Sequence, residues 1–128
     1  REIIRSLRTN GIVGMVMDQD AQDSDGRVFV EFFGRKASTI SSVAVLSQRL
    51  DLPILPMFDI RGRRGRHRIL VLPPLEFEKR ESLEQSILHN TRRYQEVLER
   101  GIRRHPDQWN WIHRRWKRRP SGEPPIYD

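Results

Sequence analysis

The apolar positions in the first quarter of the chain change their spacing from segment to segment. Apolar side chains in residues 1–8 recur at helical spacing, and Asn10 or Gly11 suits the left-handed residue that ends a helix. Residues 11–17, GIVGMVM, form a continuous apolar run, which predicts a short strand buried on both faces. Residues 28–33, VFVEFF, are β-branched and aromatic and predict a second strand. A polar loop is predicted between the two strands.

The middle of the chain predicts a helix followed by a hairpin. The segment GRKAS after the second strand is interpreted as a connection. Ser38 or Thr39 can cap a helix over residues 40–50, whose small and aliphatic side chains follow a three-four spacing. Strands are predicted at residues 52–60 and 67–72, and the turn RGRRGR between them indicates that they form an antiparallel hairpin.

The last third of the chain predicts two helices. Ser82 and Gln85 have the spacing of a capping box, which opens a long amphipathic helix that reaches about Arg104. Pro106 can begin a second, short helix with the sequence DQWNWIHRRWKRR. The large apolar side chains of that helix, at spacings of three and four, are Trp109, Ile112 and Trp116.

The order of these elements predicts an α/β fold. Two strands, a helix, two further strands and a helix indicate a mixed β-sheet flanked by helices. Residues 1–120 would belong to one domain, and residues 121–128 would form an irregular tail. The acidic loop after residue 17 would then lie at the carboxyl end of the first strand, where α/β sheets usually place their sites.

Charge narrows the range of partners. The chain has 24 lysines and arginines against 17 aspartates and glutamates, a net charge of +7. This balance favours polyanionic partners, namely nucleic acid, anionic lipid headgroups or an acidic carrier protein. The basic residues concentrate in the blocks 61–68, 99–105 and 113–120. There is no cysteine, which excludes disulfides and thiolate zinc sites.

Four aspartates crowd into the acidic loop, at positions 18, 20, 23 and 25. A calcium loop would need an acid at its first position and a glutamate at its twelfth. With Gly26 at the sixth position these places hold Ala21 and Phe32, so we predict no metal site. A magnesium-phosphate site at Asp18 and Asp20 lacks a phosphate-binding loop.

The four aspartates divide into two pairs. Asp23 and Asp25 are ordinary turn formers next to Gly26. Asp18 directly follows the apolar run and is predicted to be partly desolvated and to need a partner, and Asp20 is intermediate between Asp18 and the turn formers.

The basic and aromatic segment near the C-terminus has three possible interpretations. Its tryptophans and arginines suit an anionic lipid surface. They equally suit single-stranded nucleic acid. Alternatively, the tryptophans pack on the core and the charges are merely solvated.

The order of residues permits a Ser-His-Asp arrangement, but no histidine of the chain has an obvious general-base context. None of the four histidines is followed by an acid five positions later, since these places hold Leu72, Tyr94, Asn110 and Arg118. Neither a G-x-S-x-G nor an H-E-x-x-H pattern occurs.

Several stretches together resemble a known family. The stretch GIVGMVMDQDAQDSDGRVFVEFFGRKAST, with the later LPILPMF and RILVLPP, resembles the second half of the bacterial lipid A biosynthesis acyltransferases. These are the lauroyl- and myristoyl-transferases of the lysophospholipid acyltransferase superfamily. The ending HPDQWNWIHRRWKRRP resembles the C-terminal signature of that family, and the likeness covers roughly residues 11–120.

The resemblance implies a function and a location. It implies the C-terminal half of a glycerolipid-acyltransferase-like fold, in a membrane-associated enzyme at the cytoplasmic face of the bacterial inner membrane. The enzyme would move a fatty acyl chain from acyl carrier protein to a hydroxyl of an anionic glycolipid, a lipid A precursor, in lipopolysaccharide biosynthesis. The family's general base, the histidine of a His-x4-Asp or His-x4-Glu pair, is expected upstream of this chain. The chain alone would be an inactive C-terminal fragment, and neither a cofactor nor a nucleic acid partner is expected.

The resemblance also assigns site residues. It implies that Asp18 or Asp20 orients the acceptor or supports the site electrostatically. The residues it implies for substrate binding or support of the site are Asp18, Gln19, Asp20, Phe33, Gly34 and Thr39. The residues it implies for contact with headgroups or the membrane are Trp109, Trp111, Arg114, Arg115 and Trp116.

The sequence departs from the family pattern at two positions. Met17 and Glu31 stand where relatives often carry proline, which bears on the geometry of the loop.

The alternative functions are an acyltransferase for another glycolipid such as phosphatidylinositol mannoside, a basic nucleic-acid-binding module and a calcium-binding structural domain.

Overall fold

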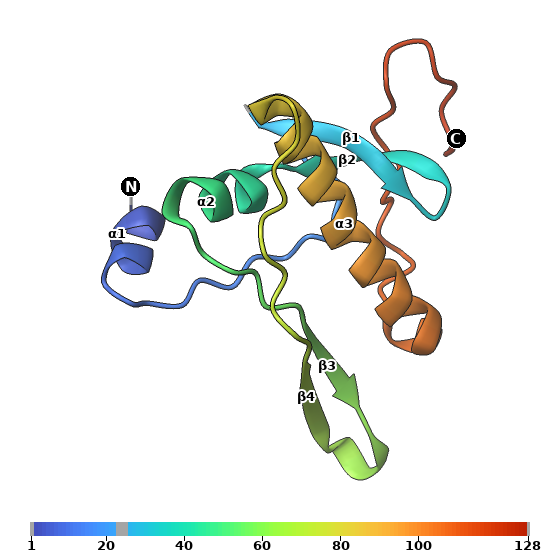
Figure 1. Ribbon diagram of the computed structural model, residues 1–128. Helices are drawn as coiled ribbons and strands as arrows, with labels where there is room; N and C mark the ends of the chain where they lie inside the picture. Colours follow the sequence, from blue (N-terminus) through green and yellow to red (C-terminus); the bar gives the residue numbers. More distant parts are fainter. Residues whose placement is uncertain (1, 23–25, 128) are drawn as a thin grey trace.

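A computed structural model of the chain describes residues 2–22 and 26–127, so Asp23 and Asp25 lie outside the described residues. The described residues form three α-helices and two β-hairpins, which can be followed in Figure 1. The elements in chain order are α1 (Glu2–Arg8), β1 (Arg27–Phe32), β2 (Arg35–Ile40), α2 (Ser42–Leu50), β3 (Met57–Arg61), β4 (His67–Val71) and α3 (Leu83–Arg104). Short 3₁₀ turns occupy Arg63–Gly65 and Pro106–Gln108.

The predicted α/β class is confirmed, and the strands form two separate antiparallel sheets. β1 pairs with β2 and β3 pairs with β4, each as a two-stranded hairpin. The helix α3 packs against β1 and α2, so that these three elements enclose most of the core. No helix among the described residues is long and apolar enough to cross a membrane.

The segment that follows β1 is a strand and not a connection. Phe32 pairs with Arg35, and the two residues between them, Phe33 and Gly34, have φ values of 51° and 72°. A two-residue turn with positive φ at both positions matches the twist of a hairpin. The prediction of a connection over GRKAS was therefore wrong, because this turn folds the small residues of β2 back onto β1.

The predicted cap of α2 was also wrong. Ser38 and Thr39 lie fully buried in β2, and the residue that precedes α2 is Ser41. The helix itself is confirmed, and it buries Val43, Ala44 and Ser47.

Residues 11–17 are extended but pair with no strand among the described residues. Met15 and Met17 pack on a core cluster of α2 and α3, whereas Val16 on the other side is 67% exposed. The prediction of a strand buried on both faces is wrong for this structure, because without neighbouring strands only one side of the segment finds a packing surface.

The prediction for α3 is confirmed at its start and its end. Ser82 Oγ accepts a hydrogen bond from Gln85 N at 3.1 Å, as a helix cap should, and the helix ends at Arg104. Gly101 lies beneath the ring of Phe58, where a Cβ atom would come within 2.3 Å of a ring carbon. This glycine therefore permits β3 to approach the helix closely.

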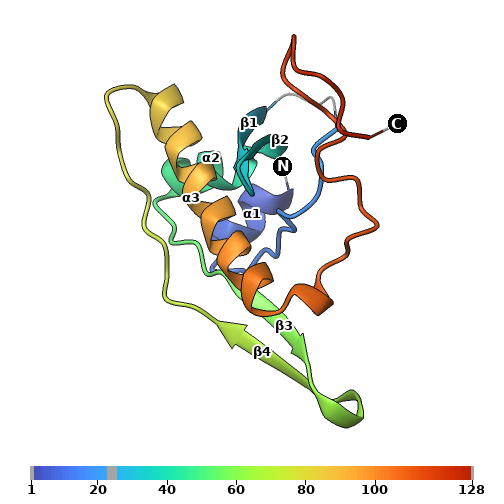
Figure 2. The same ribbon diagram turned by 90° about the vertical axis from the view of Figure 1, so that its right-hand side faces the viewer.

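The predicted short helix after Pro106 was wrong beyond its first turn. Residues 109–127 contain no helix or strand, and they pass back toward the β1–β2 hairpin (Figure 2). Ile112 is 93% exposed, although a helix would have put it on the same face as Trp109 and Trp116. The irregular backbone instead buries Arg115, whose guanidinium lies 4.9 Å from the centroid of the Phe32 ring.

Candidate functional site

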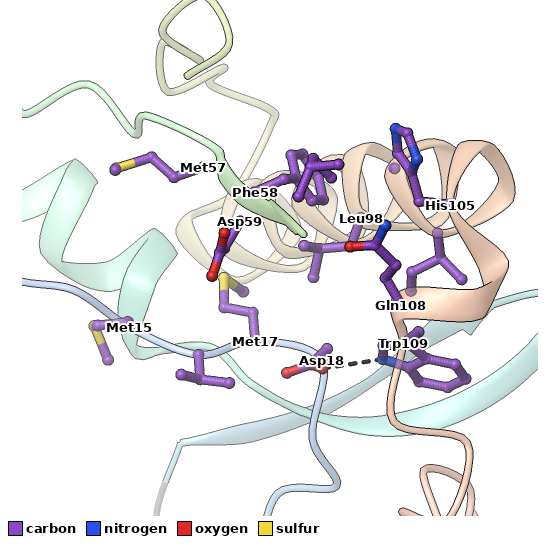
Figure 3. Close-up of a pocket in the computed structure, with 14 residues that line it drawn as sticks. Met15, Met17, Asp18, Met57, Phe58, Asp59, Leu98, His105, Gln108 and Trp109 are labelled. Atoms are coloured by element: carbon purple, nitrogen blue, oxygen red, sulfur yellow. Dashed lines mark hydrogen bonds between the residues drawn. The ribbon is translucent and has the colours of Figure 1, made fainter. Parts of the chain in front are cut away.

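The acidic segment at residues 18–20 is held by the C-terminal segment. Asp18 Oδ2 accepts a hydrogen bond from Trp109 Nε1 at 3.0 Å (Figure 3). Asp20 N donates to His113 Nε2 at 2.8 Å, and its carboxylate forms an ion pair with Arg118. Gln19 is exposed between them. Residues about 90 positions apart in the sequence thus fix the backbone of this segment.

The two aspartates have different environments. The side chain of Asp20 is only 4% exposed, and its Oδ1 is buried without a hydrogen-bond partner among the described residues. A buried carboxylate of this kind depends on its cationic partner for stability. Asp18 is partly exposed and lies in the wall of a groove. The geometry therefore favours Asp18 as the carboxylate that a ligand could reach and Asp20 as a structural anchor.

Arg115 connects the C-terminal segment to β2 and α3. Its guanidinium donates to Ser38 O at 2.6 Å, to Thr39 Oγ1 at 2.7 Å and to Gln95 Oε1 at 3.1 Å. Burial lowers the pKa of Arg115 to about 10, while the negative charges of Asp20 and Asp18 act in the opposite direction. The group remains charged at neutral pH.

The expected contact of Arg115 with lipid headgroups does not fit this structure. The residue is 0% exposed, and its two terminal nitrogens donate to buried oxygen atoms of β2 and α3. Thr39 is likewise fully buried, and its hydroxyl supports Arg115 without reaching the groove.

The tryptophans divide between the core and the surface. Trp109 and Trp116 pack edgewise or tilted on Phe32, each with ring centroids 5.8 Å from it. Trp116 Nε1 donates to Phe32 O at 3.1 Å, so this ring is anchored to β1. Trp111 is 58% exposed. For Trp109 and Trp116 the interpretation as core packing is the better one, whereas membrane contact by Trp111 and by the exposed Arg114 stays a prediction.

The turn between β1 and β2 is fixed by α3. Phe33 N donates to Glu99 Oε1 at 2.9 Å, and the guanidinium of Arg103 lies 4.8 Å from the centroid of the Phe33 ring. Gly34 lines a polar hollow with Lys36 and Arg119. Neither residue lines the groove beside Asp18, so their role in binding stays a prediction.

The groove beside Asp18 has a volume of about 450 Å³ and a mostly apolar lining (Figure 3). Its walls come from the extended segment 15–18, from β3 and from the C-terminal half of α3. The apolar residues that line it are Met15, Val16, Met17, Met57, Phe58, Ile60, Leu98, Ile102 and Trp109. The polar residues that line it are Asp18, Asp59, His105 and Gln108. An apolar groove with a few polar groups suits an elongated apolar ligand with a polar end.

Sequence reasoning missed most of this groove. β3 was predicted as a strand, but its side chains were not assigned to a site. Gly101 was the available signal, because a glycine within a long amphipathic helix often marks the close approach of another element.

The histidines provide no complete acid–base centre. His113 is bound to the backbone of Asp20, and His89 contacts Glu78 at 2.7 Å. His67 Nδ1 lies 2.8 Å from Asp59 in a pair that is half exposed. In the part of the chain that the structure describes, no three histidines, aspartates or glutamates gather as metal ligands would.

The chain is similar to bacterial acyltransferases of lipid A biosynthesis. Residues 1–118 match the model of a family described as bacterial lipid A biosynthesis acyltransferase. The lipid A biosynthesis palmitoleoyltransferase of Escherichia coli (strain K12) is 29% identical over 129 residues, which cover 99% of this chain and 40% of that protein. A lipid A biosynthesis acyltransferase of Shigella flexneri shows the same identity and coverage. The lipid A biosynthesis lauroyltransferase of Escherichia coli (strain K12) is 27% identical over 98% of this chain. The chain spans about 40% of the length of these relatives.

Proposed function

Because the chain belongs to the bacterial lipid A biosynthesis acyltransferase family, we propose that its protein moves a fatty acyl chain from acyl carrier protein to a hydroxyl of a lipid A precursor. The family match confirms the resemblance that the sequence motifs indicated. The observation that carries the proposal is the position of Asp18, in the wall of an apolar groove within a chain of this family.

The groove is the part of the chain that receives the acyl group. Its volume of about 450 Å³ lies within the range of ligand pockets, and its methionine, leucine and isoleucine side chains offer an adaptable apolar surface. Gly101 keeps β3 and α3 close together, so the groove stays narrow along these two elements.

Asp18 orients the acceptor. Trp109 donates a hydrogen bond to one carboxylate oxygen and fixes the side chain at the groove wall. An ionised carboxylate has further lone pairs that can accept a hydrogen bond from a sugar hydroxyl. The network of Asp20, Arg118 and His113 holds the neighbouring backbone in place.

The general base belongs to the longer protein and not to this chain. In the family a histidine of a His-x4-Asp or His-x4-Glu pair removes the proton from the acceptor hydroxyl, and this chain contains no such pair. The chain alone should therefore be inactive. The net charge of +7 supports polyanionic partners, which fits an acidic carrier protein and a phosphorylated glycolipid at the cytoplasmic face of the inner membrane.

Acyl transfer by the full-length protein tests this proposal. We expect Asp18→Asn to lower the rate by about 10- to 100-fold, since one oriented hydrogen bond near a reacting group is lost. Asp51→Asn is the matched control, because Asp51 is exposed, does not line the groove and ends α2 with a left-handed φ that asparagine tolerates.

Two results would contradict the proposal. An unchanged rate of acyl transfer in Asp18→Asn would show that Asp18 does not orient the acceptor. Transfer to phosphatidylinositol mannoside but not to a lipid A precursor would instead favour the other glycolipid acceptor.

A further inference from the structure

The β3–β4 hairpin stands out from the body of the molecule. In both views it projects away from the layer that α2, α3 and the β1–β2 hairpin form (Figures 1 and 2). Every residue from 61 to 71 is exposed. The segment carries five arginines, here called the basic tip: Arg61, Arg63, Arg64, Arg66 and Arg68.

The charges of the basic tip are not neutralised by the part of the chain that the structure describes. None of the five guanidinium groups forms an ion pair with any residue that the structure describes. The acid of this hairpin, Asp59, is bound to His67. Five like charges within eight residues repel one another, so the hairpin is complementary to a dense array of negative charge. The fork of donors on arginine matches a phosphate group.

One face of the hairpin carries exposed apolar side chains beside the ion pair of Asp59 and His67. Met57 lies opposite Val71, and Ile69 lies opposite Asp59, which puts these side chains on the same face. Met57, Ile69 and Val71 are 57%, 54% and 52% exposed. Phe58 on the other face packs against Gly101. The hairpin thus uses one face against α3 and presents exposed aliphatic side chains on the other, directly beside the basic tip.

We propose that the β3–β4 hairpin docks the protein on an anionic lipid bilayer. The basic tip binds the lipid phosphates, and Met57, Ile69 and Val71 enter the boundary between headgroups and acyl chains. Cationic side chains next to exposed apolar ones are typical of segments that lie in the membrane interface. An acidic protein would neutralise the arginines but would leave the aliphatic face without a partner.

The position of β3 links this surface to the groove. Met57, Phe58 and Ile60 line the groove, so a hairpin bound to a bilayer brings the groove next to the lipid. The inference itself does not depend on acyl transfer, because it rests on exposure, charge and register alone.

A fluorescent probe on the hairpin tests the inference directly. The chain contains no cysteine, so Ile69→Cys in the purified protein accepts a single environment-sensitive label within this chain. We expect a blue shift with vesicles of phosphatidylcholine and 30 mol % phosphatidylglycerol, weakened by 0.5 M salt, because apolar insertion and phosphate binding act together. A label at Gln85→Cys, exposed at the start of α3, is the matched control and should not shift.

Arginine variants separate the basic tip from the net charge. In the labelled protein, the triple variant Arg63→Gln/Arg66→Gln/Arg68→Gln should bind the vesicles more weakly. The lipid concentration that gives half of the blue shift should rise by roughly 100-fold, at about fivefold for each arginine. Arg49→Gln/Arg100→Gln/Arg104→Gln changes the net charge equally at exposed positions outside the hairpin, and should have a small effect.

Three outcomes would overturn the inference. The first is an unshifted Ile69→Cys label with the anionic vesicles. The second is equal weakening by both triple variants. The third is a shift of the label that requires an acidic carrier protein and does not occur with vesicles. Acyl transfer can be measured on detergent-solubilised acceptor in the same variants, so failure of docking is distinguishable from failure of the proposed chemistry.

Discussion

The replacement of Arg115 by methionine tests whether the C-terminal segment is held by one buried cation. Methionine keeps much of the side-chain volume but removes all the donors. Three buried oxygen atoms, on Ser38, Thr39 and Gln95, would each lose the hydrogen bond that Arg115 donates, and Asp20 would lose a nearby positive charge. Removing one partner from a buried charged network costs about 3–5 kcal/mol.

That loss is large against the total stability of a domain, about 5–15 kcal/mol. We therefore expect Arg115→Met to lower the free energy of unfolding by about 3–5 kcal/mol. Urea unfolding followed by tryptophan fluorescence is the assay, because all three tryptophans of the chain lie in the segment that Arg115 anchors. The slope with urea should stay the same if only the native state is affected.

The neighbouring Arg114→Met is the matched control. Arg114 is exposed and its guanidinium lies 5.7 Å from the centroid of the Tyr127 ring, so its loss should cost about 1 kcal/mol or less. Equal losses in the two variants, or a loss below about 1 kcal/mol for Arg115→Met, would refute the anchoring role of Arg115.

Two further predictions concern α3 and its partners. The pKa of Glu78 is lowered from 4.5, first by a hydrogen bond with His89 and then by the charges of Arg93, His89 and Arg80, while burial acts in the opposite direction. This interaction stabilises the fold above pH 4.5 and is lost as the pH falls through the lowered pKa. The difference in thermal midpoint between the wild type and Glu78→Gln should therefore shrink below pH 4.5. A gap that widens on acidification would contradict this reasoning. Gly101→Ala places a Cβ 2.3 Å from the ring of Phe58, and we expect a loss of about 1–3 kcal/mol in urea unfolding, which Phe58→Leu should partly relieve by shortening the side chain. Additive effects of the two changes would argue against this contact.

Sequence patterns within a short segment correctly predicted the helix and the hairpin that form through contacts between residues close in sequence. The capping pair Ser82 and Gln85 and the apolar spacing that follows them identify α3, because both features act within one helix. The β3–β4 hairpin was likewise predicted, since two β-rich runs flank a glycine-rich turn. These elements need no information from distant parts of the chain.

The failures come from contacts between distant residues. The apolar run at 11–17 suggested a buried strand, but a strand forms only when a partner lies beside it. The residues of β2 gave no strand signal, because its small polar side chains are buried with partners far away in the sequence. Ser38 Oγ donates to Ala21 O, and Thr39 Oγ1 accepts from Arg115.

Only part of the candidate site could be predicted, because most of it also depends on contacts between distant residues. Asp18 could be identified because it directly follows an apolar run, and its partner Trp109 lies 91 positions away. Arg115 could not be distinguished from Arg114, Lys117 or Arg118 by sequence, although it alone of these four is fully buried. The walls of the groove on β3 and α3 also depend on how these elements meet.

Photocrosslinking with an acyl donor tests the central claim most directly. An acyl carrier protein loaded with a fatty acid that bears a diazirine near its methyl end is irradiated with the full-length protein, and the labelled peptides are identified by mass spectrometry. If the groove receives the acyl chain, labels will appear in the β3 segment 57–60 or the α3 segment 98–102, and unlabelled fatty acyl donor will compete them away. Labels confined to residues outside the groove, with full transferase activity in the same preparation, would contradict the account.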